Sequence, residues 1–271
     1  MAAQEELDGE DTMLKFFGSE LVRLRNKRGV GQKELAQATH SSQALVSKIE
    51  TADRVPSRDF TRDADSFLDT GGHLARLWPL VIKYAYPSWF RPFVELEKQA
   101  TIIRSYETMI VPGLLQTRAY ARAILSESRS PNLETLLDVR MERQALLERE
   151  TPPELWVILE EAALRRVIGG ADVMAEQLQR IIDAAEQPAT VVQVIQSESG
   201  CHAGIEGPFA TLAFEKGNPV VYVDGFIQGQ LLADPGHLKT ANRTYDLLLG
   251  AALPVRKSVD LIARIMKELP K

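Results

Sequence analysis

The sequence predicts a mainly α chain with an α+β part, in which an all-α N-terminal domain and a helical connector precede a C-terminal α+β domain with a small sheet. Apolar residues recur at helical spacing over the first 80 residues, and four short stretches after residue 151 are rich in β-branched and aromatic residues. The chain has 271 residues, 45% of them hydrophobic. This length suggests two domains of roughly 100 to 200 residues each.

The N-terminal pattern predicts five helices. They are expected over residues 13–28, 32–39, 43–50, 57–68 and 70–78. Gly29 is suited to end the first helix, and Ser42 is well placed as the N-cap of the third. Because helices this short are marginal alone in water, we expect them to pack tightly against one another.

The second half predicts strands that alternate with helices. Residues 79–150 are expected to be irregularly helical, since prolines interrupt their start and residues 134–149 have helical spacing. After Thr151-Pro152-Pro153 the pattern changes. Strands are predicted at ELWVILEE, ATVVQVIQ, FATLAF and VVYVD, and helices at about 171–186, 237–250 and 257–268. The expected parts are an acidic flexible tail (1–12), a helical domain (13–79), a helical connector or interaction region (80–150) and an α+β domain for a partner or ligand (151–271).

The charge is distributed unevenly along the chain. The net charge of −5 gives no general reason to expect nucleic-acid binding. Residues 13–62, however, hold ten Lys or Arg against five Asp or Glu, whereas residues 1–12 hold five acids and no base. This asymmetry favours an anionic partner for the basic segment. A basic surface that serves only solubility is the alternative.

No membrane or secretion segment is evident. No stretch approaches the roughly 18 apolar residues of a membrane span. The start MAAQEELDGED is acidic where a secretion signal would be basic and then apolar. The single cysteine, Cys201, cannot form an internal disulfide, which agrees with a reducing compartment. We therefore expect a cytoplasmic protein without membrane partners.

No pattern of residues predicts catalysis. The four histidines are scattered, whereas metal sites need clustered ligands. The stretch GCHAGIEGPF lacks the Gly-Lys-Ser/Thr ending that cradles nucleotide phosphates. We expect neither enzymatic activity nor a cofactor or metal.

Residues 40–50, HSSQALVSKIE, have the composition that a DNA-reading helix requires. Such a helix needs apolar residues that dock it on a scaffold and short or polar side chains that reach base edges. Val46 and Ile49 can supply the first set. The short or polar side chains that could reach base edges lie on the rest of the helix surface: Gln43, Ala44, Ser47 and Lys48. On spacing alone, a helical bundle without DNA contacts is an equal alternative.

The run GVGQKELAQATHSSQALVSKIETADRVPS resembles the phage-repressor or XRE type of helix-turn-helix. Leu35-Ala36 in the first motif helix, the Val-Ser-Lys-Ile-Glu run and Pro56 carry the resemblance. It implies that Glu50 holds the fold rather than touching DNA. It also implies five DNA-facing positions: Gln32, Gln43, Ala44, Leu45 and Lys48. Ser42, Ser47 and Arg54, whose side chains could reach a base or a phosphate, complete the set of candidate DNA-binding residues.

The sequence departs from that family pattern in three places. Gly31 replaces the usual hydroxyl cap, His40-Ser41 replaces a glycine and an apolar residue in the turn, and Thr51-Ala52 replaces an Arg-Gly pair. Glycine is tolerated at an N-cap, and histidine is among the residues that adopt a positive φ. Arg54 could supply the phosphate contact that the missing arginine would make.

Further matches cover the rest of the chain, over about residues 70–266. In order along the chain, they are TGGHLARLW, WFRPFVELEKQA, VPGLLQTRAYARAI, RMERQALL, EEAALRRVIGG and GPFATLAF. These strings resemble the domain of unknown function attached to helix-turn-helix regulators of Streptomyces and related actinomycetes, including the WhiJ-like group. The resemblance implies an antitoxin-like regulator with a small partner protein encoded nearby.

Together these observations predict a transcription regulator of the cytoplasm and nucleoid that binds double-stranded operator DNA and acts close to its own gene. A homodimer is expected, because one such module makes few base contacts and two half-sites multiply the discrimination. The alternative is a protein-interaction antitoxin that neutralises a small partner, with DNA binding secondary.

Three features of the second half have more than one interpretation. VPGLLQT is expected to be a tight turn that launches a helix and buries Leu114 and Leu115, rather than a catalytic loop. The aromatic residues of YPSWFRPF belong either to the core or to a partner surface. The third feature is a polar group expected to lie on a solvated face, to form a salt bridge to Glu160 or Glu161, or to bind an anionic ligand: Arg140, Arg143 and Gln144.

Overall fold

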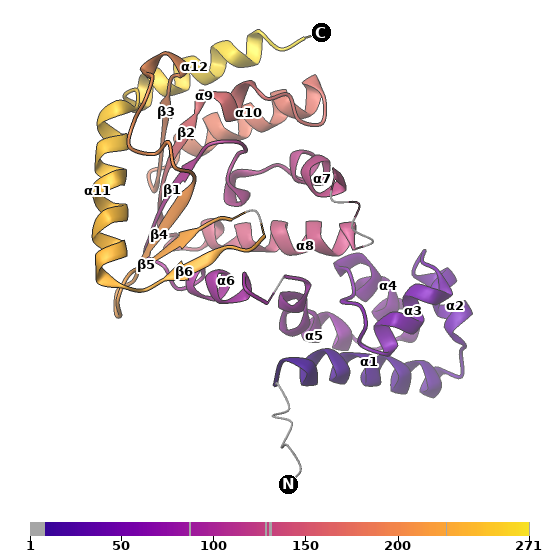
Figure 1. The fold of residues 1–271 in the computed structure, drawn as a ribbon. Helices are drawn as coiled ribbons and strands as arrows, with labels where there is room; N and C mark the ends of the chain where they lie inside the picture. The colour runs from indigo at the N-terminus through magenta and orange to yellow at the C-terminus, as the bar shows by residue number, and fades with distance from the viewer. Residues whose placement is uncertain (1–8, 87, 128, 130–131, 226, 271) are drawn as a thin grey trace. The chain divides into compact units, whose positions relative to one another are not determined.

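The computed structural model describes residues 9–86, 88–127, 129, 132–225 and 227–270. These residues form helices α1 to α12 and one six-stranded mixed sheet (Figure 1), which confirms the predicted fold class. They divide into two compact units. The helical unit contains the described residues of 1–88 and 131–139, and the α+β unit contains those of 89–130 and 140–271. The chain thus returns to the first unit at residues 131–139. The domain division predicted after residues 79 and 150 does not include this return, and that division stays a prediction.

The five predicted N-terminal helices are all present. The helical unit contains α1 (Gly9–Arg28), α2 (Gln32–Ala38), α3 (Gln43–Glu50), α4 (Arg58–Leu68), α5 (His73–Val81), a 3-10 turn (Ile82–Ala85) and the first part of α8 (Leu133–Arg143). Helix α1 begins inside the acidic segment 1–12, of which residues 1–8 lie outside the described residues.

The core of the helical unit forms where the apolar spacing places it. Phe17 and Leu21 of α1 are fully buried, as are Val46 and Ile49 of α3. At Gly18, between the first two, a Cβ atom would lie 2.5 Å from the carbonyl oxygen of Glu50 and 2.8 Å from that of Ile49. The backbones of α1 and α3 therefore approach each other so closely that only glycine fits.

A segment from far along the chain completes the helical unit. The backbone N–H of Arg58 donates to Oδ2 of Asp138 at 3.0 Å, at the start of α4. Thr135 Oγ1 donates to the carbonyl oxygen of Val55 at 3.2 Å. Val139 packs with Trp78 and Ile82. Local spacing gives no sign of these contacts. It predicts one helix over residues 134–149, whereas α8 ends at Arg143 and a 3-10 turn (Gln144–Glu148) follows.

The α+β unit contains the four predicted strands and two others. Its helices are α6 (Arg91–Glu97), α7 (Arg118–Glu127), the end of α8, α9 (Glu161–Arg165), α10 (Ala171–Ala185), α11 (Pro235–Ala251) and α12 (Val255–Lys267). Its strands are β1 (Ile102–Glu107), β2 (Glu154–Glu160), β3 (Thr190–Ile195), β4 (Phe209–Ala213), β5 (Val220–Val223) and β6 (Gln230–Leu232). β1 and the short edge strand β6 are the two that the sequence analysis missed.

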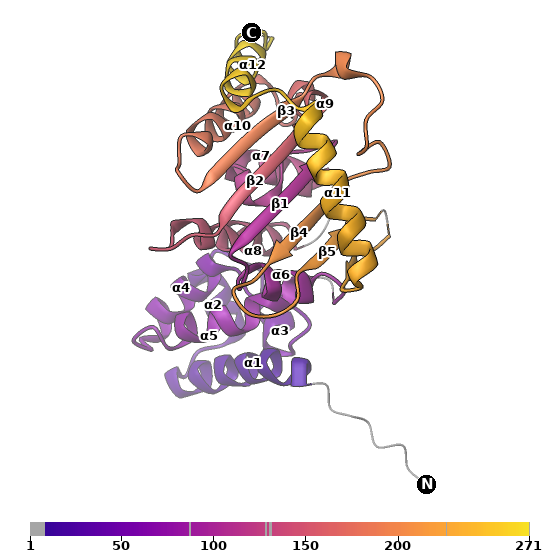
Figure 2. The ribbon, with the colours of Figure 1, turned by 90° about the vertical axis from the view of Figure 1, so that its left-hand side faces the viewer.

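The sheet has a parallel half and an antiparallel half. The strand order is β3-β2-β1-β4-β5-β6, with β1, β2 and β3 parallel and β4, β5 and β6 antiparallel to their neighbours. Helix α11 crosses one face of the sheet (Figure 2), where Tyr245 and Leu248 pack with Tyr106 and Ile158. The other face packs with α10 and α12. Because both faces are covered, β2 is a nearly continuous apolar run.

The prediction of helix through residues 79–150 is wrong for β1, which is a central strand of the sheet. Ser105 and Tyr106 of this strand are both buried. A strand buried on both faces normally shows an apolar run. Here Ser105 and Glu107 line a cavity instead of filling a core. These polar residues hide the strand in the sequence.

Candidate nucleic-acid interface

Helix α3 has one face in the core and one face in solvent. Val46 and Ile49 are fully buried, whereas Gln43, Ala44 and Lys48 are exposed. With about 100° of rotation per residue, the exposed residues and half-buried Ser47 occupy an arc of about 140°. The structure thus brings four of the predicted DNA-facing residues together on one surface, which we call the α3 arc: Gln43, Ala44, Ser47 and Lys48.

Two further candidates contribute to the fold of α3 as well. Ser42 is the N-cap, and its hydroxyl oxygen accepts from the backbone N–H of Leu45 at 3.1 Å. Such a cap contributes about 1 kcal/mol. Leu45 is half-buried and packs against the core of the helical unit, so only part of its side chain is available to a thymine methyl.

A buried carboxylate ties three helices together. Glu50 is 5% exposed, and its Oε1 accepts from Nε of Arg25 at 2.6 Å. Its Oε2 accepts from Nε2 of Gln32 at 2.7 Å. The prediction that Glu50 holds the fold is confirmed. Gln32 is half-buried and keeps its amide oxygen and second N–H for other partners, so its phosphate contact stays a prediction.

The structure accommodates each departure from the family pattern locally. The backbone N–H of Gly31 donates to Oε2 of Glu34 at 2.6 Å, so Glu34 supplies the half of a capping box that needs no side chain at the N-cap. His40 and Ala52 adopt φ values of 49° and 64°. This left-handed conformation costs about 1 to 2 kcal/mol for a residue other than glycine. Both turns around α3 therefore keep the geometry that glycine would normally allow.

Arg54 does not lie on the α3 arc. Its half-buried side chain lines a cavity of about 510 Å³ in the helical unit, together with Leu45, Asp59 and Asp138. Burial lowers the pKa of its guanidinium. Its phosphate contact stays a prediction, although less of the group is available than in an exposed arginine.

Some exposed basic side chains of the helical unit were not among the candidates, and three of these stand out: Lys27, Arg28 and Lys33. Arg23 and Arg25 form ion pairs with acids of the helical unit, whereas among the described residues these three do not. Lys33 directly follows Gln32 in the first turn of α2. All three residues belong to the basic excess counted over residues 13–62. Only the structure distinguishes them from the basic residues whose charge an acid neutralises.

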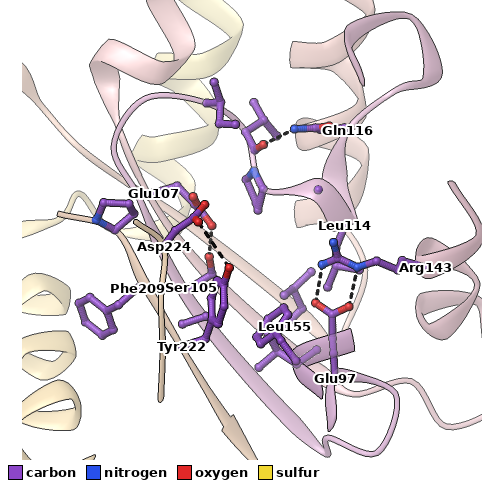
Figure 3. Close-up of a pocket in the computed structure, with 18 of the residues that line it drawn as sticks. Glu97, Ser105, Glu107, Leu114, Gln116, Arg143, Leu155, Phe209, Tyr222 and Asp224 are labelled. Carbon is purple, nitrogen blue, oxygen red and sulfur yellow. Dashed lines mark hydrogen bonds and ion pairs between the residues drawn. The ribbon is translucent and has the colours of Figure 1, made fainter. Parts of the chain in front are cut away.

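In the α+β unit, the predicted salt bridge from α8 to Glu160 or Glu161 is wrong. Arg143 instead donates Nε and Nη2 to the carboxylate of Glu97 at 2.8 and 2.7 Å (Figure 3). Arg140 donates to Oε1 of Gln116 at 2.9 Å. The end of α8 is held by α6 and the segment after β1, and not by the end of β2.

Two core predictions are confirmed. The VPGLLQT segment forms a 3-10 turn (Gly113–Leu115) ahead of α7, with Leu114 and Leu115 buried. Phe93 is buried, and Trp89 and Phe90 pack against the same core. The structure therefore supports the core interpretation of these aromatic residues.

The described residues offer neither a metal site nor a membrane span. No group of three or more His, Cys, Asp or Glu residues in this part of the chain could hold a metal ion. Within the same residues, every helix is too short or too polar to cross a bilayer.

Comparison with protein families identifies two domains in this chain. A family model described as a helix-turn-helix domain matches residues 17–78, and a second described as domain of unknown function DUF5753 matches residues 90–264. No curated protein and no solved structure matches the chain. The second model covers more than half of the sequence. The chain therefore carries an N-terminal helix-turn-helix domain and belongs to the DUF5753 family.

Proposed function

We propose that this protein is a sequence-specific transcription regulator that reads operator DNA with the α3 arc. The observation that carries the proposal is the division of α3 into an exposed polar arc and a buried apolar face. A reading helix inserts such an arc into the major groove. The excess of basic residues in 13–62 and the exposed Lys27, Arg28 and Lys33 support contacts to the phosphate backbone.

The proposal extends to assembly and location. The protein acts as a homodimer on two half-sites, because one module of this size makes few base contacts. It regulates its own gene from the cytoplasm and nucleoid, as the resemblance to antitoxin-like regulators of actinomycetes implies. It acts by binding, without catalysis or a cofactor.

Titration of a labelled duplex from upstream of its own gene tests DNA binding directly. Fluorescence anisotropy at low ionic strength is expected to show saturable binding that competitor DNA of unrelated sequence displaces only at large excess. Absence of binding at low ionic strength would contradict the proposal.

Gln43→Ala is expected to relax base preference at one position of the operator, by about 1 to 3 kcal/mol, because a glutamine amide can pair with an adenine edge. The measurement compares affinities for four duplexes that differ at that base pair. Gln187→Ala is the matched control, since Gln187 is exposed in the α+β unit. An unchanged order of the four affinities in the Gln43 variant would count against the assignment.

Lys48→Ala is expected to weaken binding to all duplexes alike. If the ammonium meets a phosphate, the slope of log affinity against log salt falls by about 1, because one fewer counterion is released. Lys216→Ala, which removes an exposed lysine of the α+β unit, should leave the slope unchanged. A slope equal to that of the unsubstituted protein would place Lys48 away from the phosphates.

Exposed apolar residues favour a second candidate function, that of an antitoxin that neutralises a small partner protein. In the α+β unit, Ile205 is 69% exposed, Ile227 is 85% exposed and Leu247 is 56% exposed. A partner protein could cover apolar side chains that are this exposed in the free chain. A Gln43→Ala, Lys48→Ala double variant separates the two functions. If it still neutralises the protein encoded beside it while DNA binding is lost, neutralisation does not depend on DNA contact.

A further inference from the structure

The α+β unit contains a cavity of about 160 Å³ at the carboxyl end of β1 (Figure 3). It lies where the two halves of the sheet meet, because β1 pairs with parallel β2 on one side and with antiparallel β4 on the other. Open α/β sheets commonly bind ligands beyond the carboxyl ends of their strands, at the point where the strand order reverses. The position alone therefore favours a binding site.

Two carboxylates face this cavity. Glu107 ends β1, and Asp224 directly follows β5. Ser105 Oγ donates to Oε1 of Glu107 at 2.5 Å, and the hydroxyl of Tyr222 donates to Oδ1 of Asp224 at 3.4 Å. Figure 3 shows the two carboxylates pointing toward the same part of the cavity. Neither forms an ion pair within the described part of the chain.

The nearby positive groups have partners of their own. The guanidinium of Arg143 is held by both carboxylate oxygens of Glu97 and lies 5.2 Å from the ring centroid of Phe90. Arg140 donates to the amide oxygen of Gln116. An anionic ligand would therefore meet arginines that already have acceptors, and it would also meet two carboxylates.

Aromatic rings form an apolar wall beside the carboxylates. The centroids of Phe93 and Tyr222 are 4.3 Å apart, and those of Phe90 and Tyr222 are 5.7 Å apart. Ile103 and Leu155 extend this wall. Aromatic faces attract organic cations, and apolar walls accommodate a short hydrocarbon chain.

We propose that this cavity binds a small primary amine in its ammonium form, with the carboxylates of Glu107 and Asp224 as counter-charges and the aromatic wall against the hydrocarbon part. The proposal rests on the proposed function and gives a ligand class to the α+β unit, the part of the chain that was expected to bind a partner or a ligand. It is tested without DNA, so its failure would leave the DNA-binding proposal intact.

The charged and polar groups around Glu107 make amine binding dependent on pH. Burial is the main cause that raises the pKa of Glu107 to about 7, and the charge of Asp224 raises it further, while Ser105 and Arg143 act in the opposite direction. Glu107 is therefore largely protonated at pH 6 and largely ionised at pH 8. Since an alkylammonium ion keeps its charge over this range, its affinity should rise about tenfold from pH 6 to pH 8.

Isothermal titration calorimetry of the full chain tests the proposal with ethylammonium and n-butylammonium, and with n-butanol and butyrate as neutral and anionic counterparts. The expected result is that at least one amine binds, more tightly at pH 8 than at pH 6, and that butanol and butyrate do not bind. Failure of both amines, equal binding of butanol, or binding of butyrate in preference would overturn the proposal.

Two isosteric variants assign the binding to the carboxylates. Glu107→Gln and Asp224→Asn are each expected to lower amine affinity at least tenfold, and the first is also expected to abolish its pH dependence. Glu107→Gln should fold, because it removes a buried charge and keeps the shape of the side chain. Glu215→Gln, at an exposed position, is the matched control and should bind like the unsubstituted chain. Unchanged affinity in both cavity variants would overturn the proposal.

Discussion

Replacing Glu97 by alanine is expected to destabilise the α+β unit by about 3 to 5 kcal/mol. Glu97 is 2% exposed, and its carboxylate accepts two hydrogen bonds from Arg143. Without it, the largely buried guanidinium of Arg143 would keep its charge and lose these two hydrogen bonds. Urea unfolding, followed by the fluorescence of the aromatic residues, measures the loss.

Helix α6 offers a matched control for this prediction. Glu95 pairs with Lys98 at 3.4 Å, but both side chains are nearly half exposed. Glu95→Ala should therefore cost less than about 1 kcal/mol. Replacing Glu97 and Arg143 together by leucine and methionine should recover most of the loss, because the buried ion pair is then exchanged as a whole for apolar side chains. A loss in Glu97→Ala no larger than that in Glu95→Ala would show that solvent reaches Arg143.

Gly18→Ala is expected to destabilise the helical unit by about 1 to 3 kcal/mol and to lower the affinity for operator DNA. In a helix interior this change normally stabilises by about 0.5 to 1 kcal/mol. At Gly18, however, the new methyl group would lie 2.5 Å from the carbonyl oxygen of Glu50. That atom belongs to the backbone and cannot rotate away, so α1 and α3 must separate. The separation would move the α3 arc.

The same substitution at Gly250 is the control for Gly18→Ala. Gly250 lies in α11, and no atom would come within 4 Å of an added Cβ. Gly250→Ala should therefore raise stability by about 0.5 to 1 kcal/mol and leave DNA affinity unchanged. Thermal unfolding and fluorescence anisotropy of both variants give the comparison. A stabilising effect at Gly18 would mean that α1 and α3 do not touch as described.

The sequence predicted those features of the fold that depend on local spacing. The apolar face of α3 repeats at three residues, so the buried Val46 and Ile49 follow from helix geometry. Gly18 lies within the helical pattern of residues 13–28, but a glycine there looks only like a weak helix former. Its role depends on a second helix that the local pattern does not contain.

Predictions of pairing between distant residues were less successful. Arg143 pairs with Glu97, 46 residues away, and no spacing rule favours this partner over Glu160 or Glu161. Likewise, the Gln32 amide donates a hydrogen bond to Glu50 only because α2 and α3 pack together. The sequence identified the exposed residues of the candidate DNA interface. It could not show which of the other candidates also hold the fold.

The amine cavity was beyond prediction for a related reason. Glu107 ends β1 and Asp224 directly follows β5, and both strands are neighbours of β4 in the sheet. In the chain, the two carboxylates lie more than a hundred residues apart. Ser105 and Glu107 replace the apolar residues that would have marked β1 as a central strand. The residues that form the candidate ligand site are therefore the same residues that concealed the strand.

The return of residues 132–139 to the helical unit affects how the DNA-binding part is made. A ribosome releases the N-terminal helices first. The start of α4 nevertheless lacks the carboxylate of Asp138, and Trp78 lacks the cover of Val139, until that later segment has been synthesised. The nascent helical unit thus stays incomplete while much of α6, β1 and α7 is translated. A gene fusion that transfers DNA binding to another protein would need to carry this segment as well.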